Sequence, residues 1–174
     1  MCPLRFTDKA RQVLRAMVLG YCAAGGRRKP GGTILKAQPK KKKVKKLTVT
    51  KVQDAVNYAI RMRDGGCINH DGTCKGNLEA SHFFGKGGNG GLRFYPPNIH
   101  GQCSKHHFDH HQRNPLCYVR WMQEYCPEEL EWMESARRRV VKYSQPVLRD
   151  IYDLARRGAL DELTEYIRAL IVNG

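Results

Sequence analysis

The sequence has no long hydrophobic run. No stretch of its 174 residues approaches 18 consecutive apolar positions, so we expect no membrane-spanning helix and no membrane partner. The first residues, MCPLRFTDKARQVL, carry charges where a secretory signal peptide has its apolar stretch. We therefore expect a cytoplasmic protein. Hydrophobic residues make up 41% of the chain, which is enough for a modest core.

Acidic residues are scarce in the first third of the chain. Residues 1–66 hold 17 Lys and Arg against 3 Asp and Glu, whereas residues 115–174 hold 9 against 10. Nearly all of the net charge of +15 therefore lies before residue 67. This asymmetry predicts a basic arm that contacts a polyanion. We favour nucleic acid over a purely solubilising tail, because the centre of the chain indicates the same partner.

A disulfide framework is not expected either. The seven cysteines are an odd number, and the cytoplasm is reducing, so free thiols and metal ligands are the better interpretation. Histidines, in contrast, are crowded. Four of the seven fall within residues 106–111, inside the segment NIHGQCSKHHFDHH that spans residues 98–111.

The sequence divides into three regions of an α+β protein. Residues 1–47 are expected to form a basic N-terminal helix, beginning at Thr7, and a flexible Lys-rich arm that includes QPKKKKVKKL. The arm resembles a nuclear localisation signal, but we favour phosphate contact. The arm residues expected to bind DNA are Lys40, Lys41, Lys42, Lys43, Lys45 and Lys46.

Residues 48–114 are expected to hold a helix and a small core. The helix is predicted to start at a Thr50 cap, with Gln53 completing a capping box, and to stop at Gly65. Its predicted buried stripe is Val52, Val56, Ala59, Ile60 and Met62. Residues 78–83 resemble a strand. Residues 115–174 are expected to be helical, with helices near 116–125, 128–143, 146–157 and 161–172.

Two ligand pairs predict a structural zinc site. Cys67 and Cys74 lie in one loop, CINHDGTC, and Cys103 and His106 lie in a second, CSKH. Thiolate and imidazole ligands in two such loops are what a tetrahedral zinc ion requires. His70 competes with Cys74 for the fourth position, because CINH has the same two-residue spacing as CSKH; we favour Cys74. The zinc would support a core with little apolar surface of its own.

The other histidines predict a second metal. If a helix starts at the CSKH turn, His107 and His111 lie one turn apart on the same face, a spacing suited to joint coordination of one ion. His110 is expected to face solvent or a phosphate. His82, on the strand-like segment, would face the helix across a small ββα unit and take a proton from water. Asn98 would bridge backbone groups of the loop and fix the orientation of His82.

This set of residues resembles the HNH, or ββα-metal, nucleases. The carrying motifs are YAIRMRDGGCINH (58–70), ASHF (80–83), LRF (92–94) and NIHGQCSKH (98–106), and within the superfamily they are most similar to the lambdoid-phage NinG/Rap recombination proteins. The resemblance covers roughly residues 55–120. It departs from the common pattern at Ser81, where many HNH enzymes place an Asp or His metal ligand directly before the base.

The resemblance implies a zinc-stabilised HNH core flanked by N-terminal and C-terminal helices. The expected activity is metal-dependent hydrolysis of DNA, preferably branched DNA such as a Holliday junction, by a homodimer. Its cofactors would be structural Zn²⁺ and catalytic Mg²⁺ or Mn²⁺. Arg93 and Lys105 are expected to contact DNA phosphates. The alternatives are an HNH enzyme of restriction, homing or packaging type, and a non-catalytic zinc-stabilised DNA-binding protein.

Overall fold

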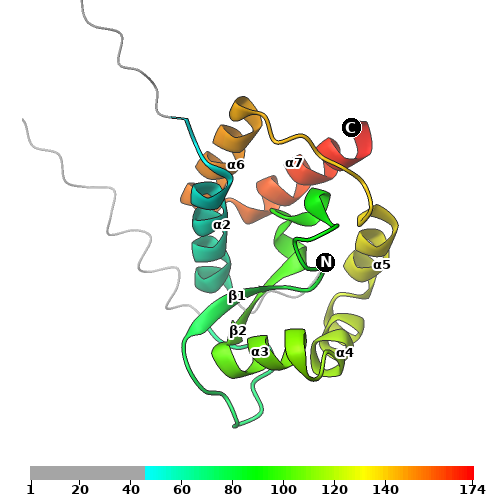
Figure 1. Cartoon of the computed structure of the whole chain (residues 1–174). Coiled ribbons are helices and arrows are strands. Elements are labelled where there is room, and N and C mark those ends of the chain that lie inside the picture. Colours follow the sequence, from blue (N-terminus) through cyan, green and yellow to red (C-terminus); the bar gives the residue numbers. More distant parts are fainter. Residues whose placement is uncertain (1–45) are drawn as a thin grey trace, which may run out of the picture. The chain divides into compact units, whose positions relative to one another are not determined.

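The computed structural model describes residues 46–174, which belong to one compact unit. The predicted helix from Thr7 and the arm lysines 40–45 lie outside the described residues; Lys46 is exposed. The described part contains six α-helices and a two-stranded antiparallel sheet, which confirms the predicted α+β class (Figure 1). None of its helices is long and apolar enough to cross a bilayer.

The first described helix, α2, spans Val49–Asp64. Its N-cap is Thr48, whose side chain accepts a hydrogen bond from the backbone N–H of Lys51, so the prediction of Thr50 as the cap is wrong by two residues. Gly65 ends the helix with φ +63°, a conformation that glycine adopts without strain. Gln53 forms no capping box. Its side chain is buried and hydrogen bonds to Asn57.

The buried face of α2 follows helical spacing. Val52, Val56, Ala59 and Ile60 are buried, as predicted. Met62 is 59% exposed, and its predicted place in the stripe is wrong. Two residues beyond Ile60 correspond to a rotation of about 200° around the helix axis, which turns Met62 to the solvent side.

The sheet consists of β1, Leu78–His82, and β2, Ile99–Cys103. The strands are antiparallel and pair Ala80 with Gly101 at their centre. The connection between them contains two short 3₁₀ turns, η1 (Gly90–Leu92) and η2 (Pro96–Asn98). Helix α3, Ser104–Gln112, follows β2 directly and packs against both strands, as does α2 (Figure 1). The chain therefore forms β1, β2 and α3 in succession.

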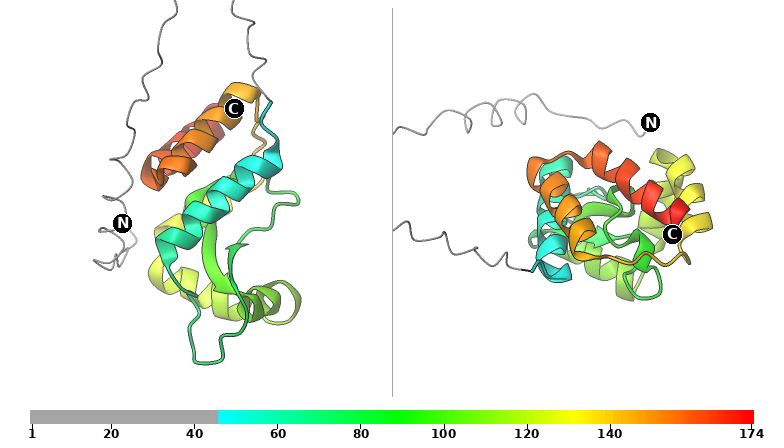
Figure 2. Two further views of the ribbon diagram at one scale, coloured as in Figure 1. Left: turned by 90° about the vertical axis from the view of Figure 1, so that its left-hand side faces the viewer. Right: turned by 90° about the horizontal axis from the view of Figure 1, so that it is seen from above.

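Four helices complete the unit: α4 (Leu116–Tyr125), α5 (Pro127–Ala136), α6 (Gln145–Arg157) and α7 (Leu160–Asn173). Helix α6 packs on α2, and α7 packs on η1 and η2 (Figure 2). The predicted helix over 128–143 is too long. The helix ends at Ala136, and the chain beyond it is anchored at Tyr143, which packs its ring on Phe94 and donates its hydroxyl to the Gly90 and Gly91 carbonyls.

Candidate metal centre and active site

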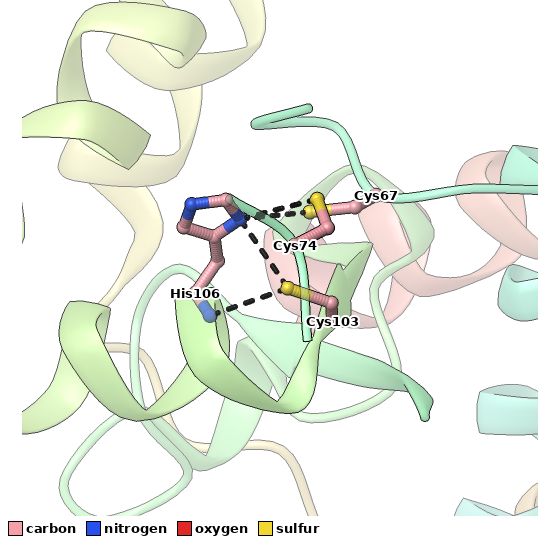
Figure 3. A group of neighbouring side chains, drawn as sticks. All are labelled: Cys67, Cys74, Cys103 and His106. Atoms are coloured by element: carbon pink, nitrogen blue, oxygen red, sulfur yellow. Dashed lines mark hydrogen bonds between the residues drawn. The ribbon is translucent and has the colours of Figure 1, made fainter. Parts of the chain in front are cut away.

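Three cysteines and one histidine converge beside the sheet (Figure 3). Cys67 and Cys74 come from the loop between α2 and β1, Cys103 ends β2, and His106 lies in the first turn of α3. The Nδ1 atom of His106 lies 3.3 Å from the Sγ atoms of both Cys67 and Cys103, and 3.7 Å from that of Cys74. All four candidate ligand atoms lie within 4.8 Å of one another.

This geometry fits a tetrahedral zinc ion. Zinc bonds of about 2.3 Å to sulfur and about 2.1 Å to nitrogen place a sulfur and a nitrogen ligand about 3.6 Å apart, close to the observed separations. Burial raises the pKa of the Cys67 thiol to about 11, and a bound cation would favour its thiolate form. The four residues can therefore hold a structural metal such as zinc.

His70 lies at the edge of this group. Its ring is exposed, and its Nδ1 atom lies 3.4 Å from Cys74 Sγ. The set of four converging residues includes Cys74 and not His70. The geometry therefore favours Cys74 over His70 as the fourth ligand.

His82 occupies the last position of β1 and is 4% exposed. Its Nε2 atom lies 3.0 Å from the carbonyl oxygen of Arg93. The same Nε2 atom lies 3.5 Å from the side-chain nitrogen of Gln53, a longer contact. Because the closer partner is a carbonyl, which only accepts, we assign the proton to Nε2 and the lone pair to Nδ1. Within residues 46–174, no group forms a hydrogen bond with this Nδ1. Burial, aided by the positive charges of Lys86 and Arg93, lowers the pKa of His82 to about 4 and keeps it neutral at pH 7.

Asn98 is fully buried and fixes the loop that follows His82. Its Oδ1 atom accepts from the backbone N–H of Phe84 at 2.8 Å, and its Nδ2 atom donates to the carbonyls of Phe84 and Leu92, both at 3.1 Å. One amide thus joins the start and the end of the 84–92 loop. Arg93, whose carbonyl holds His82, directly follows that loop. The bridging geometry expected of Asn98 is present.

His107 and His111 lie on one face of α3, with ring centroids 4.9 Å apart. The Nδ1 atom of His107 lies 2.6 Å from Oε2 of Glu79 on β1, which leaves its Nε2 unpaired among the described residues. His107 is partly buried and His111 is exposed. Burial is the main cause that lowers the pKa of His111, and the neighbouring His107 and Lys86 lower it further. His82, Lys86, His107 and His111 therefore share one electrostatic environment.

His110, expected to face solvent or a phosphate, is partly buried, and its Nδ1 atom is turned away from solvent. Its ring packs between Phe83, at a centroid distance of 6.2 Å, and Tyr118, at 4.7 Å. Its Nδ1 atom is buried without a hydrogen-bond partner, and burial lowers its pKa to about 4. His110 is turned inward because α4 follows α3 closely and brings Tyr118 against it.

Two of the predicted DNA-contact cations, Arg93 and Lys105, are held by protein partners. Arg93 donates its Nε–H to Gln53 at 3.2 Å, and Lys105 pairs with Asp109 at 2.9 Å on the same helix. Both side chains remain partly exposed. A phosphate would have to share these cations with their present partners.

Comparison with known families gives one match. Residues 26–164 match the model of the family described as "Bacteriophage Lambda NinG protein", a span that includes α2 through α6 and the first turn of α7. The chain belongs to the NinG family. Neither the curated proteins nor the solved structures gave a match.

One polar contact in this NinG-family site was not predicted from the sequence. Glu79 accepts hydrogen bonds from both His107 and Ser104, and no role was predicted for it. A signal existed, because side chains two apart on a strand lie on one face. Glu79 therefore lies on the same face of β1 as Ser81, the position where many HNH enzymes have an Asp or His metal ligand.

Proposed function

We propose that this NinG-family protein is an HNH-type endonuclease that hydrolyses DNA phosphodiesters with a divalent cation. The observation that carries the proposal is His82, whose Nε2 is held by a backbone carbonyl and whose Nδ1 has no hydrogen-bond partner among the described residues. A neutral imidazole in this state is suited to act as a general base. It lies at the end of β1, against the helix that carries the neighbouring rings of His107 and His111.

Each residue has a role in this proposal. His82 Nδ1 takes a proton from the attacking water, and the products are a 5′ phosphate and a 3′ hydroxyl. His107, through Nε2, and His111 would hold Mg²⁺ or Mn²⁺. When bound, such an ion supplies Lewis-acid stabilisation of the charge that develops on the leaving 3′ oxygen. Asn98 keeps the 84–92 loop and the Arg93 carbonyl in place, and so keeps the orientation of His82.

The biological setting follows from the family. NinG proteins are connected with phage recombination, so branched DNA such as a Holliday junction is the proposed substrate, the host cytoplasm the proposed location, and a homodimer the proposed active form. Zinc at the Cys67, Cys74, Cys103 and His106 cluster has a structural role in this scheme. It anchors the first turn of α3, which carries His107, to the loop after α2.

The test compares wild type with His82→Ala on junction, flap, duplex and single-stranded DNA, with and without Mg²⁺ or Mn²⁺. We expect metal-dependent cleavage by wild type, at least a hundredfold slower cleavage by His82→Ala, and equal DNA binding by both, since a general base contributes about 10²–10⁴-fold. Cleavage by His82→Ala at the wild-type rate would refute the assignment of the base. Binding without cleavage by wild type on every substrate would favour a zinc-stabilised DNA-binding protein.

A further inference from the structure

A second basic surface lies outside the predicted arm. Residues 135–148 contain four Lys and Arg and no Asp or Glu, although residues 115–174 as a whole have a net charge of −1. The four cations are Arg137, Arg138, Arg139 and Lys142, here called the 137–142 cluster. All four side chains are exposed, and within residues 46–174 none of them forms an ion pair.

The 137–142 cluster is held against the loop of the proposed active site. The hydroxyl of Tyr143 donates to the carbonyls of Gly90 and Gly91, at 2.9 and 3.0 Å. The carbonyl oxygen of Arg139 lies only 2.7 Å from the point that a Cβ atom on Gly91 would occupy. Only glycine allows this approach, so the backbone of the cluster lies directly on the loop that precedes Arg93.

One member of the cluster contacts the loop through its side chain. The guanidinium of Arg137 lies 5.7 Å from the ring centroid of Phe84, a cation–π contact. Phe84 is two residues beyond His82, and Asn98 binds both its N–H and its carbonyl. The cluster is thereby connected to the proposed general base through Phe84 and Asn98. An anion bound here would lie beside the proposed active site.

We propose that the 137–142 cluster binds the phosphate backbone of the DNA beside the scissile bond. This inference rests on the proposed nuclease function and assigns a specific DNA-contact surface to it. Arginines without carboxylate partners suit phosphate oxygens, which they bind through paired N–H groups. Lys86, on the same 84–92 loop, extends the positive surface toward His82 and His111, whose pKa values it lowers. A nucleic-acid strand at the site could therefore contact Lys86 of the loop as well as the 137–142 cluster.

The experiment measures DNA binding rather than cleavage. The full-length chain carries His82→Ala, and affinity for duplex and junction DNA is measured by fluorescence anisotropy without added divalent ions, over a range of salt concentrations. The test variant is Arg138→Gln/Arg139→Gln. The control is Arg156→Gln/Arg157→Gln, an exposed pair at the end of α6 that removes the same charge. Circular dichroism and zinc content verify that both variants are folded.

We expect the Arg138/Arg139 variant, but not the Arg156/Arg157 control, to lose DNA affinity. Loss of two phosphate contacts lowers the slope of log K against log salt by about 1.8 and weakens binding roughly tenfold or more at about 0.1 M salt. The control pair should change affinity less than about twofold, because it lies outside the contact. Equal effects of the two pairs would overturn the assignment of the surface while leaving the cleavage proposal standing. Absence of DNA binding by the His82→Ala parent would overturn both.

Discussion

Glu79 on β1 accepts a hydrogen bond from His107 on α3, with 2.6 Å between Oε2 and Nδ1. Its second oxygen, Oε1, accepts from the Ser104 hydroxyl at 2.5 Å. The hydrogen bond from Ser104, and to a lesser extent that from His107, lowers the pKa of Glu79 and keeps it ionised. A carboxylate bound to one imidazole nitrogen fixes the tautomer and the ring orientation, and so directs the other nitrogen toward a metal. Glu79 is therefore placed to position His107.

We predict that Glu79→Ala weakens binding of the divalent ion proposed at His107 and His111. Loss of such a partner lowers metal affinity or activity by about 10–100-fold. The metal affinity of Glu79→Gln, which can still accept from His107, should fall between those of wild type and Glu79→Ala. The measurements are Mn²⁺ binding by electron paramagnetic resonance and cleavage against Mn²⁺ concentration. Glu134→Ala, at an exposed position of α5, is the control and should match wild type. An unchanged Mn²⁺ affinity in Glu79→Ala would exclude the positioning role.

A second prediction concerns Asn98, whose amide makes three hydrogen bonds within the loop. Asn98→Ala should lower the free energy of unfolding by about 2–4 kcal/mol, since each net hydrogen bond contributes about 1 kcal/mol and buried backbone groups lose their partner. Asn98→Asp should be no better, because a carboxylate cannot donate to the carbonyls of Phe84 and Leu92. Urea denaturation measures both. A loss below about 0.5 kcal/mol for Asn98→Ala would show that water replaces the amide.

Local signals in the sequence predicted most of the elements. Helical spacing located α2, α4, α6 and α7 within one or two residues at most ends, and loop spacing predicted the ligands that converge at the metal centre. The N-cap of α2 was misplaced because Thr48 and Thr50 both suit a cap, and the choice depends on tertiary packing. The segment after α5 is held by contacts of Tyr143 with Phe94 and Gly90, which no local pattern contains.

The site residues that the sequence missed depend on pairing across elements. The contact between Glu79 and His107 requires the packing of α3 on β1, and the inward position of His110 requires Tyr118 of α4. The 137–142 cluster was missed for another reason. Acidic residues elsewhere in residues 115–174 balance its four cations, so the net charge of the whole region does not reveal it. A shorter counting window would have shown the cluster, but not its contact with the loop.

A third prediction separates Cys74 from His70. Cys74→Ser should lose most of the bound zinc and melt at a lower temperature, because Cys74 Sγ is one of the four converging ligand atoms. His70→Ala should retain zinc, since its exposed ring lies outside that group. Zinc is measured by mass spectrometry after dialysis, and stability by thermal unfolding. Equal zinc loss in the two variants would mean that His70 is also a ligand.

The last prediction concerns pH and His100, which lies in β2 and is 5% exposed. Its Nδ1 atom lies 2.8 Å from the hydroxyl of Tyr118. Burial, aided by the positive charge of Arg63, lowers the pKa of His100 well below its ordinary value of 6.5. The unfolded chain therefore gains a proton below about pH 6.5 that the folded chain does not, so this contribution to stability is complete above pH 6.5 and is lost as the pH falls.

We expect His100→Gln, which cannot titrate, to lose less stability than wild type between pH 7.5 and pH 5. The measurement is urea denaturation of both proteins at each pH, with zinc content determined in parallel, so that acid effects on the metal centre cancel in the comparison. The variant should be less stable than wild type at pH 7.5, because glutamine fills the space beside Trp121 poorly, and the gap should narrow on acidification. Parallel pH profiles would show that His100 is protonated to the same extent in the folded and unfolded chains.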